Sequence, residues 1–222
     1  AHDVPLIIDG AYGLPFPNIV YTEATVEWNP NIILCLSLSK LGLPGTRTGI
    51  IIAREDVIDL FTCANAIMTL ASGNFGSALT LESVRNGDIF KLSNEIIRPY
   101  YKDKMENVTE AIHQHMKGIP YMLHNPEGAF FVWLWFPGLP ISDEELYARL
   151  KQRNVYVVPG RHFFPGLSGH WQHRYECIRV SYAGSKKMVR DGISIIAQEV
   201  VRAFAESGRK QFGVPSFTGT ET

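Results

Sequence analysis

The chain has 222 residues, of which 45% are hydrophobic and 19% charged, and its formal net charge at pH 7 is −1. This length and apolar content suit a globular protein of one large domain or two small ones. The near-neutral charge gives no indication of a nucleic-acid surface. The apolar runs are far shorter than the roughly 20 residues that a membrane helix needs, so we expect no contact with a membrane.

The cysteines indicate a reducing compartment. The chain has three of them, Cys35, Cys63 and Cys177, without paired spacing. A sparse, odd set of this kind in mostly apolar stretches favours reduced thiols and a cytoplasmic protein over a disulfide framework. No basic leader opens the chain, and a strand begins at Val4 with nothing before it to cover its faces. We therefore expect no signal peptide and the absence of an N-terminal portion.

The first 86 residues carry the pattern of an α/β layer. Continuous apolar runs predict three strands, at residues 4–9, 32–38 and 49–53. Runs that do not alternate are typical of strands buried on both faces. Helices are predicted at residues 54–68 and 77–86.

A long helix is predicted from about residue 88 to 116, because its apolar positions step by three and four. Pro99 lies inside it and should kink it, and such a helix could bridge two domains. Beyond Gly118 the pattern changes to an α+β unit with a mostly antiparallel sheet. Its predicted strands lie at 120–124, 129–136, 154–158 and 177–182. Its predicted helices lie at 142–153, where Ser142 and Glu145 form a capping box, and at 185–207. The tail at 208–222 reads as disordered.

Lys40 is the residue whose position most suggests chemistry. It follows one apolar strand and lies in a loop that leads to the next, together with Ser37, Ser39 and Arg47. A lysine amine forms Schiff bases with carbonyl compounds when burial or a neighbouring cation lowers its pKa. The serines and Arg47 offer donors that suit a phosphate, although the spacing is not that of a P-loop. The alternative is a charged hairpin loop with Lys40 in solvent.

Three further residues could belong to a site. Asp9 ends the first strand, and an acid at the carboxyl end of a buried α/β strand usually faces the ligand crevice. It could equally be a turn or cap residue, and Tyr12 could be a rim aromatic. Arg179 lies in a short apolar strand, either as a carboxylate clamp or, more commonly, facing solvent. The seven histidines show no metal-ligand spacing, so no metal is expected.

In chain order, Asp9-x-Ala11-Tyr12, then Ser37-x-Ser39-Lys40 with Arg47, and finally Arg179 resemble the pyridoxal-phosphate enzymes of fold type I, the class I/II aminotransferases. The resemblance covers the chain to about residue 207 and matches the second half of such an enzyme. Residues 9–17, 37–45 and 126–135 resemble the branch that exchanges valine with pyruvate. Arg47 follows Lys40 by seven residues, whereas many members have eight.

The resemblance implies a fold and a division into domains. Residues 1–86 would be the end of the large, cofactor-binding domain, a mostly parallel sheet with helices. Residues 87–207 would be an α+β small domain that includes the long linking helix, followed by the tail at 208–222.

The resemblance also implies residue roles. Lys40 would form a Schiff base with pyridoxal 5′-phosphate and then carry the proton between substrate and cofactor. Asp9 would face the pyridine nitrogen, and Tyr12 would donate to the ring oxygen. Ser37, Ser39 and Arg47 would bind the phosphate. Arg179 would bind the α-carboxylate of the substrate.

The implied activity is amino-group transfer between an aliphatic amino acid of the valine or alanine type and a 2-oxo acid such as pyruvate. The full-length enzyme would be a cytoplasmic homodimer, and its N-terminal half would complete the cofactor site. Two alternatives stay open. One is β-elimination on the same fold and cofactor, and the other is a truncated, inactive or ligand-sensing domain of aminotransferase type.

Overall fold

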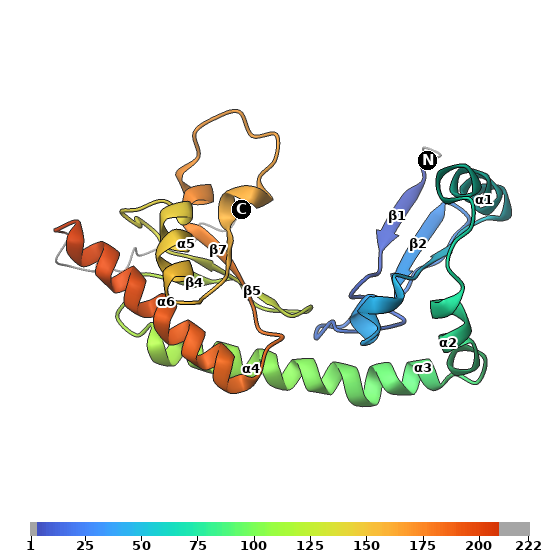
Figure 1. Cartoon of the computed structure of the whole chain (residues 1–222), viewed down its shortest axis with the longest axis horizontal. Coiled ribbons are helices and arrows are strands. Elements are labelled where there is room, and N and C mark those ends of the chain that lie inside the picture. The colour runs from blue at the N-terminus through green and yellow to red at the C-terminus, as the bar shows by residue number, and fades with distance from the viewer. Residues whose placement is uncertain (1–3, 209–222) are drawn as a thin grey trace. The chain divides into compact units, whose positions relative to one another are not determined.

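The computed structural model describes residues 4–208, which form two compact units. The first contains the chain to Lys102 together with residues 127–129, and the second contains residues 103–126 and those from Phe130 onward. Of the predicted disordered tail at 208–222, all but Gly208 lies outside the described residues. Figure 1 shows the helices and strands of both units with their labels.

The first unit is built on a three-stranded sheet in the order β1-β2-β3. β1 (Leu6–Asp9) runs parallel to β2 (Ile32–Ser37), and β3 (Gly49–Ile52) runs antiparallel to β2. All three predicted strands are therefore present, and Figure 1 labels β1 and β2, which are drawn in blue. Residues 127–129 also belong to this unit, because Gly128 forms an isolated antiparallel β-bridge with Val20.

The sheet is buried less completely than the apolar runs predicted. The even-numbered residues of β2 face a small core, whereas most side chains of β1 and β3 are exposed. The prediction of burial on both faces is wrong for the described residues, because α1 (Glu55–Thr69) buries none of its side chains and so does not cover the sheet. The core residues of this unit are Phe16, Ile32, Leu34, Leu36, Leu38, Leu41 and Ile89.

The predicted helices are confirmed with small shifts of their ends. After α1 come α2 (Phe75–Arg85) and a long helical stretch from residue 88 to 115. This stretch is α3 (Asp88–Lys91), a π-helical segment (Leu92–Ile97) and α4 (Arg98–His115). The irregular segment ends two residues before Pro99, whose ring and missing N–H disturb the regular hydrogen-bond ladder. The boundary between the two compact units lies within α4. The division into domains between residues 86 and 87 stays a prediction.

The second unit is an antiparallel sheet packed against helices, as the pattern predicted. Its strand order is β4-β5-β7-β6. The strands are β4 (Met122–Leu123), β5 (Phe131–Trp135), β6 (Val158–Pro159) and β7 (Cys177–Ser181). The helices are α5 (Asp143–Gln152) and α6 (Lys186–Glu206). One face of the central strands and the inner faces of the helices contribute to one apolar core, which includes Val132, Leu134, Leu146, Ile178, Tyr182 and Ile196.

Two sequence predictions in this unit have clear outcomes. Ser142 caps α5, since its hydroxyl accepts a hydrogen bond from the backbone of Glu145 at 3.2 Å. The strand predicted at 154–158 shrinks to Val158–Pro159. Asn154 has a φ of 59°, a left-handed conformation that an extended strand cannot include.

Candidate active site

One edge of the first unit's sheet collects most of the predicted site residues. β1 and β2 are parallel, with Asp9 opposite Cys35, so both strands end at the same edge. β3 is antiparallel and begins there, with Gly49 opposite Ser37. Side chains that follow β1, follow β2 and precede β3 are thereby brought together, although they are up to 38 positions apart in the sequence.

Lys40 lies immediately beyond the end of β2 in a single 3₁₀ turn, Ser39–Leu41. The neighbouring Leu38 and Leu41 are buried, which holds the turn against the core. Lys40 itself is half-buried, and its Nζ lies 5.4 Å from the centroid of the Tyr12 ring. An ammonium group at this distance from an aromatic face is attracted to it. The alternative of a Lys40 that only faces solvent therefore does not describe this geometry.

Asp9 and Tyr12 are placed by a tight turn at the end of β1. One oxygen of Asp9 accepts a hydrogen bond from the backbone of Ala11 at 3.0 Å, so the turn reading of Asp9 is correct as a local description. Gly10 donates to the carbonyl of Cys35 at 2.7 Å, and a Cβ at this position would lie only 2.9 Å from that oxygen. Only glycine allows this close approach, which fixes where Asp9 and Tyr12 leave the sheet.

The hydrogen-bond donors at this edge of the sheet come from Ser37, Ser39 and Arg47. The backbone N–H of Ser39 donates to the hydroxyl of Ser37 at 3.2 Å, and Nη1 of Arg47 donates to the hydroxyl of Ser39 at 3.5 Å. The Arg47 backbone is left-handed, with a φ of 48°, and its side chain is exposed. Two hydroxyls and a guanidinium within mutual reach are the donor set that suits a phosphate group.

Arg179 belongs to the second unit, on β7, and is half-buried. Its Cζ lies 4.1 Å from the centroid of the Phe131 ring and 4.7 Å from that of Phe163. Its Nε is buried and has no hydrogen-bond partner among the described residues. The solvent-facing reading of Arg179 is therefore wrong. Sequence reasoning missed the two rings as its neighbours. The period-2 aromatic pattern of residues 131–135 could have placed Phe131 on the same sheet face, but no sequence signal indicated Phe163.

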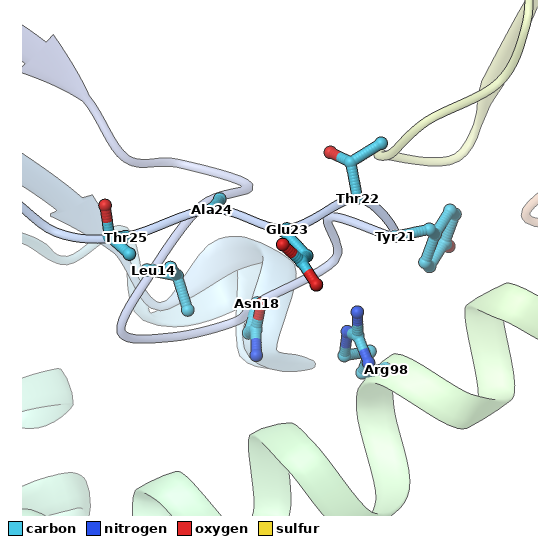
Figure 2. A pocket seen from close by; sticks show the side chains of 8 residues that line it. All are labelled: Leu14, Asn18, Tyr21, Thr22, Glu23, Ala24, Thr25 and Arg98. Carbon is cyan, nitrogen blue, oxygen red and sulfur yellow. The ribbon is translucent and has the colours of Figure 1, made fainter.

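A separate pocket in the first unit contains none of the predicted site residues. It has a volume of about 720 Å³ and is lined by Leu14, Asn18, Arg98 and residues 21–25. Figure 2 shows Arg98 projecting from its helix toward the segment that carries Tyr21 and Glu23. Nε of Arg98 donates a hydrogen bond to the carbonyl of Val20 at 2.9 Å, so this lining arginine holds the loop.

No helix within residues 4–208 is both long and apolar enough to cross a membrane. No group of three His, Cys, Asp or Glu side chains there could hold a metal ion. All three cysteines are free thiols.

Comparisons with known proteins show the family to which the chain belongs. The family described as aminotransferase class I and II matches residues 1–196, and the chain belongs to this family. It is 47% identical over 206 residues to a valine–pyruvate aminotransferase of Escherichia coli (strain K12). That alignment covers 93% of this chain and 49% of the relative.

Solved structures give the same result. The crystal structure of a valine-pyruvate aminotransferase from Salmonella typhimurium LT2 matches with a TM-score of 0.87 and 46% identity, over 92% of this chain and 53% of that one. A multiple substrate aminotransferase from Thermococcus profundus matches with a TM-score of 0.76 at 23% identity, over 92% of this chain and 49% of that one, which supports the fold alone. The predicted α/β fold of the aminotransferase type is confirmed. The chain spans about half the length of the relatives it matches.

Proposed function

We propose that the sheet edge of the first unit binds pyridoxal 5′-phosphate and that the complete protein is an aminotransferase. It would move an amino group between an aliphatic amino acid of the valine or alanine type and a 2-oxo acid such as pyruvate. The observation that carries this proposal is the convergence of an amine, an acid, a phenol and a phosphate-type donor set at one edge of the sheet. The relatives support it, because they belong to a family whose members depend on this cofactor.

The side chains of the edge fit the cofactor by type. Bound pyridoxal phosphate supplies an aldehyde that bonds covalently to an amine and a ring that withdraws electrons from the substrate. Asp9 would accept a hydrogen bond from the protonated ring nitrogen, and Tyr12 would donate one to the ring oxygen. The hydroxyls of Ser37 and Ser39 and the guanidinium of Arg47 would hold the phosphate, since Arg47 already reaches Ser39.

Lys40 would act twice. Its Nζ would hold the cofactor covalently through the aldehyde carbon. When this amine is not bonded to the cofactor, it would carry a proton to and from the substrate Cα. Arg179 would bind the substrate α-carboxylate through two parallel hydrogen bonds, which fixes the orientation of the bonds at Cα.

The finer features of the complete enzyme are also proposals. We place it in the cytoplasm, in agreement with three free cysteines. We expect a homodimer in which residues beyond those matched here complete the cofactor site, since the relatives are about twice as long. β-Elimination would use the same side chains, but the 47% identical relative is an aminotransferase, which favours amino transfer over elimination or a ligand-sensing role.

Borohydride reduction tests the role of Lys40. After pyridoxal phosphate and borohydride are added to the chain, mass spectrometry of peptides should locate any covalent adduct on Lys40. We expect only partial labelling of the chain alone and stoichiometric labelling of the full-length gene product. Lys40→Arg should abolish the adduct, whereas Lys117→Arg should not change it. Stoichiometric labelling of the chain alone would contradict the incomplete-site proposal, and labelling that survives Lys40→Arg would contradict the assignment of Lys40.

A panel of amino donors tests the reaction class. The full-length gene product should form alanine from pyruvate, with valine among its better donors. Release of ammonia or a thiol without alanine would indicate elimination instead. Preference for acidic or aromatic donors would overturn the aliphatic assignment.

A further inference from the structure

Two phenylalanine rings contact the guanidinium of Arg179, and the sheet explains one of them. Arg179 on β7 pairs directly with Trp133 on β5, and Phe131 pairs with Ser181 two positions along. Phe131 is therefore a diagonal neighbour on the same face of the sheet, where aromatic and long side chains can reach one another. The Cζ of Arg179 lies 4.1 Å from its ring centroid.

The second ring arrives from the other side of β7. Arg179 also pairs with Val158 on β6, and the chain then passes into a 3₁₀ helix, Gly160–Phe163. Gly160 presses against β7: a Cβ at this position would lie 2.6 Å from the Cβ of Cys177 and 2.7 Å from its carbonyl oxygen. This close approach, possible only for glycine, brings Phe163 to 4.7 Å from the Arg179 guanidinium.

A buried ion pair holds the same 3₁₀ helix in place. Asp143, at the start of α5, is fully buried, and its Oδ2 accepts from the backbone of Arg161 at 3.0 Å. Its Oδ1 accepts from Nε and Nη2 of Arg161 at 2.8 and 2.5 Å. These hydrogen bonds raise the pKa of Arg161 above its usual value. Three charge-assisted bonds to one buried carboxylate fix the segment two residues before Phe163.

Contacts of Phe131 and Phe163 with the face of the Arg179 guanidinium do not use the N–H groups at its edge. Its N–H groups lie in the plane of the group, whereas aromatic rings attract a cation through their faces and accept no strong hydrogen bonds. Nε of Arg179 is buried without a hydrogen-bond partner among residues 4–208. A planar guanidinium with an unmet donor is suited to receive a carboxylate edge-on, in the two-pronged geometry that lysine cannot reproduce.

We infer that Phe131 and Phe163 are positioning residues for Arg179, and that the Asp143–Arg161 pair holds Phe163 in this role. Together they orient the guanidinium so that its edge receives the carboxylate of an amino acid or 2-oxo acid. The inference rests on the proposed function for the identity of the ligand. Beyond that function, we infer that Phe131 and Phe163 affect the affinity for the carboxylate through their contacts with Arg179.

Carboxylate binding by the chain itself provides the test, without any cofactor. Sodium pyruvate is titrated into ¹⁵N-labelled chain while the Arg179 Nε–H resonance, assigned by its loss in Arg179→Lys, is followed by NMR. Sodium chloride at equal ionic strength controls for screening. Phe163→Leu keeps an apolar side chain but removes the ring and should weaken pyruvate binding about threefold to tenfold. Phe163→Tyr should restore binding to about the original affinity, because it restores the ring.

Two further variants separate positioning from general packing. Phe164→Leu is the matched control, because Phe164 contacts Trp133 and Trp171 in the same aromatic cluster. It should leave pyruvate affinity unchanged. Asp143→Asn should weaken affinity in the same direction as Phe163→Leu and should remove the ring-current shift of the Arg179 resonance.

The possible results distinguish this inference from the proposed function. Full affinity in Phe163→Leu, together with lost binding in Arg179→Lys, would overturn the positioning role and leave the carboxylate role of Arg179 intact. Pyruvate binding that survives Arg179→Lys, or no binding by the unaltered chain, would overturn both the inference and that carboxylate role. The Lys40 adduct is measured independently of each of these outcomes.

Discussion

At the scale of single residues, two of the cations proposed for the site rest against aromatic rings. Lys40 lies over Tyr12, and Arg179 lies over Phe131 and Phe163. Such contacts are worth about 0.5–1 kcal/mol at exposed sites and more where water is excluded. They hold a charged group in place through the ring faces, and Nε of Arg179 has no hydrogen-bond partner among residues 4–208. This is what a site needs if it binds a ligand through the same cation.

Cys177 gives a prediction about pH at the same scale. The thiol is buried on β7, and burial raises its pKa from 9.0 to about 12. Between these values the unfolded chain loses the proton while the folded chain keeps it, so folding stability should fall as the pH rises. The slope from this group approaches about 1.4 kcal/mol per pH unit. Urea unfolding at pH 7, 9 and 10 measures it.

The control for this prediction is a second thiol in the same chain. Cys177→Ala should flatten the alkaline decline in stability, whereas Cys63→Ala should not, because Cys63 is exposed. Equal pH slopes in the unaltered chain and in Cys177→Ala would show that the buried thiol is not responsible.

At the scale of elements, the residues of the proposed cofactor site lie at the ends of the strands and not along their middles. Parallel β1 and β2 end where antiparallel β3 begins, which gathers three loops at one edge of the sheet. Gly10 permits the first of these loops to approach the backbone of β2. In the second unit, Gly160 does the same for the segment that carries Phe163. In both units a glycine thus decides where a side chain of the proposed site lies.

Helix α4 gives a prediction at this scale. Lys104 is almost fully buried, and its Nζ donates to the carbonyl of Ala183 at 2.7 Å and to that of Gly184. These carbonyls lie in the turn between β7 and α6, so the lysine joins α4 to that turn. Lys104→Met should lower the free energy of unfolding by about 1–3 kcal/mol, because it leaves the carbonyls unsatisfied. Thermal and urea unfolding measure this.

Lys102→Met is the matched control, since Lys102 is exposed on the same helix. It should change stability by less than about 0.5 kcal/mol. A Lys104→Met chain as stable as the control would mean that water replaces the lysine at no cost.

At the scale of the whole molecule, the described chain exposes much apolar surface on α1. The exposed fractions are 87% for Ile67, 81% for Met68 and 90% for Leu70, just beyond the helix end. Globular proteins rarely leave contiguous apolar patches of this kind open to water.

This surface should bind an apolar dye. We expect 1-anilinonaphthalene-8-sulfonate to fluoresce strongly with the chain, and the double substitution Ile67→Lys with Met68→Lys to reduce the signal roughly twofold. Val201→Lys, which alters a single exposed apolar side chain on α6, should leave it nearly unchanged. Circular dichroism would verify that the helices persist. Undiminished fluorescence in the double variant would place dye binding elsewhere.

The fold was predictable to the extent that it depends on local patterns. The three-and-four spacing located the helices, and Ser142 marked the start of α5. The strand at 154–158 was predicted wrongly because apolar composition does not reveal the left-handed Asn154. The burial of β1 and β3 was also predicted wrongly, since burial depends on what packs against a strand and not on its own residues.

The sequence by itself determined which chemical groups this protein can use and their order along the chain. Asp9, Lys40 and Arg47 were recognisable because their types and spacing around strand ends are properties of the sequence. Only the tertiary structure decided that Lys40 lies over Tyr12 and that Phe163 reaches Arg179. These contacts join residues 16 or more positions apart, and they form only when strand pairing and the close approach of Gly10 and Gly160 bring the segments together.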